Sequence, residues 1–157
     1  MRKSIVGAAC CLVAHSVQAD RVFPPECPRR GTLEVVENPS DWADQCFAAF
    51  TGRMPEPGDV GETDSVMRDL DLDGVAVRLE IRGTGNSVKQ IYVFKATTSG
   101  FIYLGVLDAH PSFAVARDGA GTPTISYVYR AGVDHQELKR IQYRDSEYVE
   151  ISSERIR

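Results

Sequence analysis

The stretch Val75-Ala76-Val77-Arg78-Leu79-Glu80-Ile81-Arg82 alternates aliphatic residues with polar or small ones. A period of two is typical of a β-strand that turns one face to a core and the other to water. The four aliphatic residues are therefore expected to face the core, and Glu80 falls on the opposite, solvated face.

The same period continues toward the C-terminus in segments separated by turn residues. The turn signals follow one another about every 8 to 12 residues, as in antiparallel all-β domains. With a short strand at 32–36, the further strands are expected at 88–95, 101–107, 113–117, 124–130, 137–143 and 147–152. The sequence predicts a mainly β fold, an antiparallel meander, sandwich or small barrel of about eight strands with one N-terminal helix.

That helix is predicted just upstream of the strands. Ser40 is a good N-cap, and Gly52 ends the pattern. Large or apolar side chains recur at four-residue spacing and give the helix one apolar face; they are Trp42, Cys46 and Phe50. The segment 54–63, punctuated by prolines and glycines, is expected to be a loop.

The first residues resemble a cleaved secretory signal peptide. Arg2 and Lys3 precede a short apolar run at 5–17, and Val17-Gln18-Ala19 fits the small-residue cleavage pattern. We therefore expect a signal peptide at 1–19 and one β-rich domain at 20–157, located in the periplasm or secreted. The alternatives are a lipoprotein signal at Cys10 and a buried helix of the mature domain.

Two cysteines remain after cleavage, Cys27 and Cys46. An even pair in an oxidising compartment predicts a disulfide. The alternative is that Cys46 is a nucleophile activated by a histidine elsewhere in the chain.

Charge narrows the range of partners. Loss of Arg2 and Lys3 leaves 16 Lys and Arg against 22 Asp and Glu, a formal net charge of −6. An acidic chain disfavours nucleic acids and anionic membranes and favours a basic protein partner. The apolar run at 5–17 is also too short to span a bilayer, so no membrane insertion is expected.

The most specific pattern is Asp69-Leu70-Asp71-Leu72-Asp73-Gly74, with Glu80 six residues after the glycine. These spacings satisfy the EF-hand loop, but the strand that follows replaces its second helix. The carboxylates of Asp69, Asp71 and Asp73 are therefore candidate ligands for a weak calcium site. The alternative is an acidic turn that caps itself through aspartate hydrogen bonds.

This loop and the aromatic strands after it resemble the β-rich repeats of the FG-GAP and VCBS type. The resemblance spans about residues 69–151 and includes Tyr92-Val93-Phe94, Gly100-Phe101-Ile102-Tyr103-Leu104 and Tyr148. Leu72 departs from it, since glycine or asparagine is usual there. The resemblance implies a small periplasmic β protein, and some exported proteins of this general kind inhibit wall-degrading hydrolases or give immunity to them.

No enzyme motif is present in the sequence. His110 and His135 stand in no metal-binding spacing and near no nucleophile elbow. The pairs Asp108–His110 and Asp134–His135 sit beside turns and are expected to face solvent. The tyrosines are expected to pack on the strands, or to form an interaction surface where several share an exposed face; they are Tyr92, Tyr103, Tyr127, Tyr129, Tyr143 and Tyr148.

The sequence therefore predicts a non-catalytic protein that binds and inhibits another protein, a basic peptidoglycan hydrolase, and needs no cofactor. Polar hairpin tips are the expected contact, because small side chains enter a cleft without burying a charge; they are Gly83, Gly85, Asn86, Ser87, Thr97, Thr98 and Ser99. The alternative is a calcium-dependent carbohydrate-binding module or an exported enzyme that uses the loop at 69–73.

Overall fold

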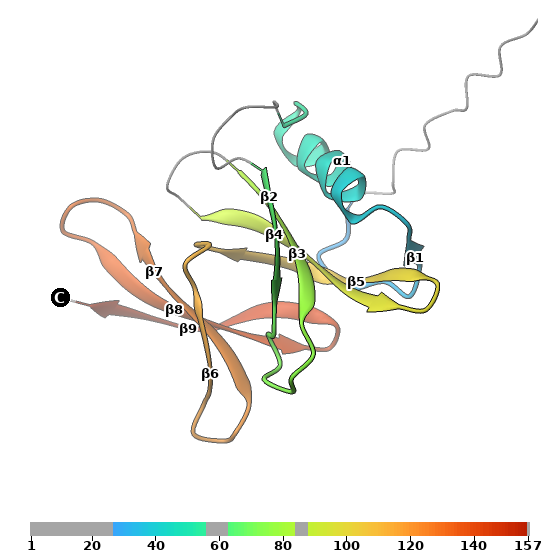
Figure 1. Ribbon diagram of the computed structural model, residues 1–157. Coiled ribbons are helices and arrows are strands. Elements are labelled where there is room, and N and C mark those ends of the chain that lie inside the picture. Colours follow the sequence, from blue (N-terminus) through green and yellow to red (C-terminus); the bar gives the residue numbers. More distant parts are fainter. Residues whose placement is uncertain (1–26, 56–62, 84–87, 157) are drawn as a thin grey trace, which may run out of the picture.

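The computed structural model describes residues 27–55, 63–83 and 88–156, which contain one helix and nine strands (Figure 1). In chain order they are β1 (Val35–Val36), α1 (Pro39–Thr51), β2 (Thr63–Arg68), β3 (Val77–Arg82), β4 (Lys89–Thr97), β5 (Gly100–Ala109), β6 (Ala114–Arg117), β7 (Pro123–Arg130), β8 (Gln136–Arg144) and β9 (Glu147–Ile156). The prediction of a mainly β fold with one helix near the N-terminus is confirmed.

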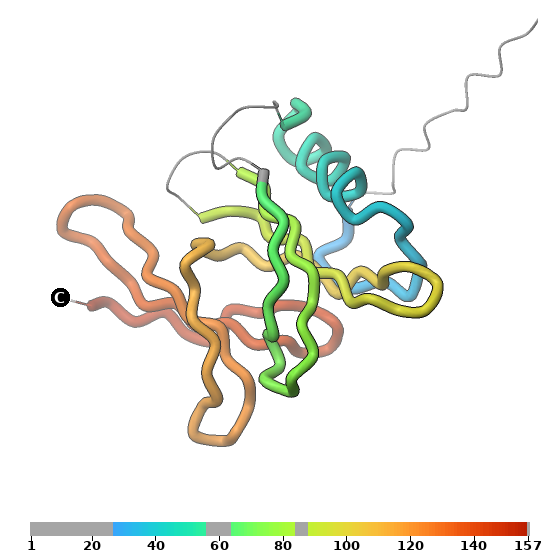
Figure 2. The backbone as a smooth tube through the Cα atoms, in the orientation of Figure 1, coloured from blue at the N-terminus to red at the C-terminus, as the bar shows by residue number. Residues whose placement is uncertain are grey.

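The strands form two antiparallel sheets, and neither closes into a barrel. Sheet A has the order β1-β5-β4-β3-β2, and sheet B has the order β6-β7-β8-β9. Helix α1 lies against one face of sheet A, and sheet B packs against the other face (Figures 1 and 2). Within the described residues, no helix has the length and hydropathy of a membrane span.

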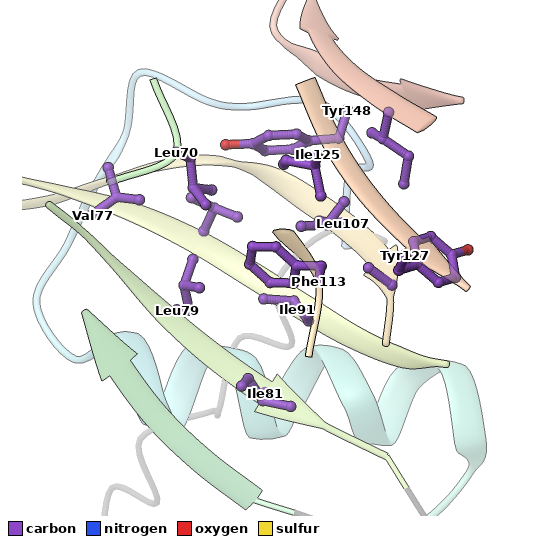
Figure 3. Packing of buried hydrophobic residues seen from close by; sticks show 13 residues of the cluster. Leu70, Val77, Leu79, Ile81, Ile91, Leu107, Phe113, Ile125, Tyr127 and Tyr148 are labelled. Atoms are coloured by element: carbon purple, nitrogen blue, oxygen red, sulfur yellow. The ribbon is translucent and has the colours of Figure 1, made fainter. Parts of the chain in front are cut away.

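The core between the sheets is built from aliphatic and aromatic side chains of both (Figure 3). Leu79 and Ile91 of sheet A are fully buried, and Ile125 of sheet B is nearly so. Phe113, just before β6, lies among them and is also buried. Burial of these side chains is the main source of cohesion between the sheets.

A second core lies between sheet A and the helix. The Trp42 ring stands edge-on to Phe94, with ring centroids 5.7 Å apart, and lies 4.2 Å from the Tyr103 ring. Cys46, on the inward face of α1, is bonded to Cys27, which confirms the expected disulfide. The bond ties the segment before β1 to the helix.

This second core explains why the expectation for Glu80 was wrong. The sequence placed its side chain on a solvated face, but α1 covers that face and Glu80 is 0% exposed. The carboxylate accepts from Arg78, Arg82 and the Ser65 hydroxyl. β3 is therefore covered on both faces, although its sequence alternates in polarity. Its charged side chains, Glu80 and Arg82, can be buried because they pair with each other.

The helix ends at Gly52, as predicted, but its N-terminal end and one side chain differ from the prediction. Asn38 is the N-cap, not Ser40, and its side chain accepts from the backbone N–H groups of Ser40 and Asp41. Pro39 therefore occupies the first helical position, where its missing N–H group is no loss. Phe50, expected on the apolar face, is 50% exposed, whereas Ala43, Cys46 and Phe47 are the buried apolar residues of the helix turns before it.

Several strand boundaries also differ. The loop was expected to reach residue 63, where β2 in fact begins; the sequence did not predict this strand, because its alternation is weak. Residues 56–62 of the loop lie outside the described residues. The strand expected at 32–36 is reduced to β1, and the strand expected from residue 113 begins at Ala114. Val75, expected to face the core, is half exposed, because β3 begins only at Val77 and Val75 lies in the loop before it.

Gly105 lies where the N-terminal segment runs antiparallel along β5, at the edge of sheet A. Its backbone forms a bridge with Arg30, and a bulge in the β4–β5 ladder lies beside it. Gly105 has φ of 135°, and a Cβ atom would lie 2.9 Å from the carbonyl oxygen of Arg29. The close approach of the two backbones therefore requires glycine for both conformation and space.

Candidate functional site

The aspartate loop before β3 is held by its own side chains. Asp69 accepts from the backbone N–H of Gly74 at 2.8 Å and of Asp73 at 3.3 Å, and Asp73 accepts from Val75 at 2.8 Å. The bond from Gly74, more than any other contact, holds the pKa of Asp69 below its usual value. These bonds have the pattern of a self-capping turn.

Two further features bear on a calcium role. Leu72 has φ of 55°, so the residue that departs from the resemblance occupies a left-handed position that favours glycine or asparagine. The guanidinium of Arg117 donates to the Leu72 carbonyl at 3.0 Å. Across the described ranges 27–55, 63–83 and 88–156, no three His, Cys, Asp or Glu side chains gather in a geometry that would hold a metal ion.

The predicted hairpin tips do not form one surface. Gly83 follows the end of β3, and its carbonyl accepts from Lys89 at the start of β4, whereas Thr97 and Ser99 lie at the other end of β4. A strand of this length separates its ends by roughly 25–30 Å at about 3.3 Å per residue. Three of the named residues, Gly85, Asn86 and Ser87, lie outside the described residues.

The tip at 97–100 is exposed and is held by its own hydrogen bonds. The Thr97 hydroxyl donates to the Gly100 carbonyl at 3.1 Å, and its oxygen accepts from the Ser99 backbone N–H at 3.3 Å. Thr98 and Ser99 are the turn residues, and their side chains are exposed. Gly100 packs against Val35 so closely that a Cβ atom would lie 2.8 Å from it. β1 therefore supports one side of this tip.

The candidate reactive groups are occupied by structural contacts. Cys46 is buried in its disulfide, which overturns the alternative that it acts as a nucleophile. His110 bonds Ser112 instead of Asp108, and His135 bonds Glu137 instead of Asp134. The two aspartate–histidine pairs suggested by the sequence are therefore not formed. Both histidines are partly buried, not fully solvated.

The tyrosines divide into three groups. Tyr92 and Tyr103 are fully buried under α1, and burial raises the pKa of both. Tyr127 and Tyr148 belong to the core between the sheets, whereas Tyr129 and Tyr143 are each 36% exposed. The pair Tyr143 and Tyr148 is in ring contact, with centroids 4.8 Å apart.

Sequence reasoning missed a hollow beside β7, with a volume of about 750 Å³. β6 pairs with β7 from Arg117 to Ala114 and no further, because the chain turns at 110–113. β7 continues past this point, and its last residues line the hollow, which we call the β7 groove. Its walls are formed by Val88, His110, Ser112, Ala114, Ser126, Tyr127, Val128, Tyr129, Arg130 and Leu138.

The signal that could have revealed this groove is a mismatch in strand length. The segment between Pro111 and the turn at 118–122 is too short to match the run from Pro123 to Arg130. In an antiparallel hairpin, the longer strand then projects beyond its partner.

Neither family models, curated proteins nor solved structures give a match to this chain. The resemblance to FG-GAP and VCBS repeats therefore stays a prediction.

Proposed function

We propose that this protein is exported and acts by binding, as an inhibitor or immunity protein of a peptidoglycan hydrolase. The observation that carries the proposal is the exposed, self-bonded tip at 97–100, which joins the two long strands β4 and β5 (Figure 1). A rigid projecting hairpin with small polar residues is suited to enter a substrate cleft.

The tip is rigid for reasons that lie in its surroundings. Residues Lys89 to Thr97 pair with β5 along the whole of β4, and β1 covers the outer side of β5 at Phe101 and Ile102. A loop that is already ordered loses little conformational freedom on docking, so more of the contact energy remains as affinity. Thr98 and Ser99 provide hydroxyl groups that can donate to and accept from the cleft wall.

Charge supports a basic partner. The chain after residue 19 has a formal net charge of −6, which accelerates encounter with a positively charged enzyme. Inhibition should therefore set in more slowly as salt is raised, since screening weakens steering between separated charges.

The test is co-expression with candidate wall amidases and muramidases in the periplasm, scored by protection from lysis and by complex formation. Ser99→Trp places a bulky side chain at the exposed tip and should abolish protection. Ala120→Trp is the matched control, because Ala120 is an exposed turn residue of the β6–β7 hairpin. It should leave protection unchanged.

Two outcomes would contradict the proposal. Protection that survives Ser99→Trp, in a variant shown to be folded, would mean that the tip is not the contact. If none of the hydrolases is bound or inhibited by the wild-type protein, the inhibitor function itself is wrong.

A further inference from the structure

The β7 groove exposes backbone groups that are ready to pair with another strand. At the β6–β7 turn, the backbone N–H of Asp118 donates to the Thr122 carbonyl, so every second residue after Thr122, namely Thr124 and Ser126, directs its backbone N–H and C=O groups toward β6. The next residues whose backbone N–H and C=O groups point to this side of β7 are Val128 and Arg130. Within the described residues, no strand pairs with them on this side (Figure 1).

The opposite edge of the same stretch is fully used. Tyr129 and Tyr127 pair with Glu137 and Lys139 of β8, and Ala131 donates to His135 at the end of the hairpin. β8 therefore holds this part of β7 extended, while its other edge faces the groove. A sheet edge held open in this way is a template for strand addition.

The side chains of the groove define what would fit. Val128 is 40% exposed beside Leu138, its cross-strand neighbour, so the groove offers an apolar surface. Arg130 is exposed, and no carboxylate among the described residues forms an ion pair with it. An incoming strand should therefore carry an apolar side chain opposite Val128 and an acidic one opposite Arg130.

We propose that the β7 groove binds an extended acidic–x–apolar segment of a partner protein by strand addition, antiparallel to β7 and in line with β6. Opposite residues of an antiparallel pair share one face, so the acidic residue meets Arg130 and the apolar residue meets Val128. Each of these two pairs can exchange two backbone hydrogen bonds. The groove is separate from the tip at 97–100, so either proposal can fail without the other.

The probe is the peptide acetyl-Thr-Glu-Thr-Val-Thr-amide, added to ¹⁵N-labelled protein up to several millimolar and followed by NMR. In the free protein, the amides of Val128 and Arg130 should exchange with solvent quickly, whereas those of Tyr127 and Tyr129 are protected by β8. The peptide should shift the first two amides and slow their exchange.

Modified peptides distinguish backbone pairing from nonspecific binding. N-methylation of the valine removes a donor that points at β7 and should weaken binding about fivefold or more. N-methylation of the central threonine is the matched control, since its N–H group points away, and it should change affinity little. Equal losses from the two modifications would overturn strand addition.

The charge preference has its own test. Arg130→Glu should weaken binding of the glutamate peptide and favour a peptide with lysine in its place, with changes of about two- to fivefold each. If Arg130→Glu does not reverse the preference between the glutamate and lysine peptides, the acidic specificity is wrong. Absence of any shift at Val128 and Arg130 would overturn the site. So would a free protein that sediments as a dimer with both amides already protected, since a second copy would then fill the groove.

Discussion

The Nε atom of Arg82 lies 2.6 Å from Oδ1 of Asp44, and this contact joins β3 to helix α1. The Arg82 side chain is 2% exposed, and it also donates to the fully buried carboxylate of Glu80. A buried charge is tolerated when its partner is present, because an unpaired charge is far more costly to remove from water. The helix is therefore held by paired charges as well as by apolar packing.

Arg82→Ala should destabilise the protein by about 3–5 kcal/mol, because it removes the buried charge that pairs with both Glu80 and Asp44 and leaves the half-buried Arg78 as the remaining charged partner of Glu80. Denaturant unfolding measures the change. Arg140→Ala is the control, since Arg140 pairs with Glu154 at an exposed site and such pairs contribute less than about 1 kcal/mol. Equal losses from the two changes would mean that the buried contact does not hold the helix.

Removal of the disulfide by Cys27→Ser with Cys46→Ser should lower the free energy of unfolding by about 3 kcal/mol, as closure of a loop of this size predicts. Protein purified from the periplasm should start at Asp20 and take up no alkylating reagent until it is reduced. Intact mass spectrometry checks both points. Two free thiols in the native protein would contradict the pairing.

Gly105→Ala should destabilise by about 1–3 kcal/mol, because alanine resists the positive φ at this position and its Cβ would collide with the Arg29 carbonyl. Gly119→Ala is the matched control, since Gly119 has open space and no positive φ. Thermal unfolding of the two variants gives the comparison. A Gly105→Ala protein as stable as wild type would show that the N-terminal segment can shift away from β5.

Acid sensitivity should involve Asp118. Backbone hydrogen bonds from Thr122, and then the Gln142 amide and Ala120, hold the pKa of Asp118 below its usual value. The stabilisation is present above the pKa of the unfolded chain and is lost as pH falls through the lower, folded pKa. The difference in Tm between wild type and Asp118→Asn should therefore narrow below about pH 4. If the difference in Tm stays constant as pH falls, the Asp118 carboxylate is not a source of the acid sensitivity.

Calcium should bind the loop at 69–73 with a dissociation constant of about 10⁻⁴–10⁻³ M or weaker, as in extracellular modules. Asp69 is engaged by backbone N–H groups and Arg117 covers the Leu72 carbonyl, so both would have to be displaced. Calorimetry with added calcium measures the constant. A micromolar value, lost in Asp71→Asn, would contradict this expectation and favour a dedicated site.

The elements that sequence reasoning found are those whose signal is local. The helix between Asn38 and Gly52, the cysteine pair and most strands of the second half follow from caps, spacing and alternation. Glu80 could not be placed in the same way, because the helix that buries it comes from a distant part of the chain. The alternation of polar and apolar residues in the sequence is the same whether the Glu80 carboxylate is solvated by water or paired with a buried arginine.

The candidate site was harder to predict for a related reason. Thr97 and Ser99 were recognised as a turn, but the distance that separates them from Gly83 depends on the length of β4. The groove at Val128 depends on where β6 stops, and a turn at 110–113 decides that. Such boundaries depend on tertiary packing, which local residue preferences do not contain.

The N-terminal segment that pairs with Gly105 also constrains the order in which the chain can fold. The Gly31 backbone N–H donates to the Ser146 carbonyl, and Arg30 pairs with Glu147. A segment made early in synthesis therefore finds its partners in the last hairpin to be made. Contacts so distant in sequence form slowly, since a long loop must close before they are gained. The fold of such a chain is complete only after its final strands have been made.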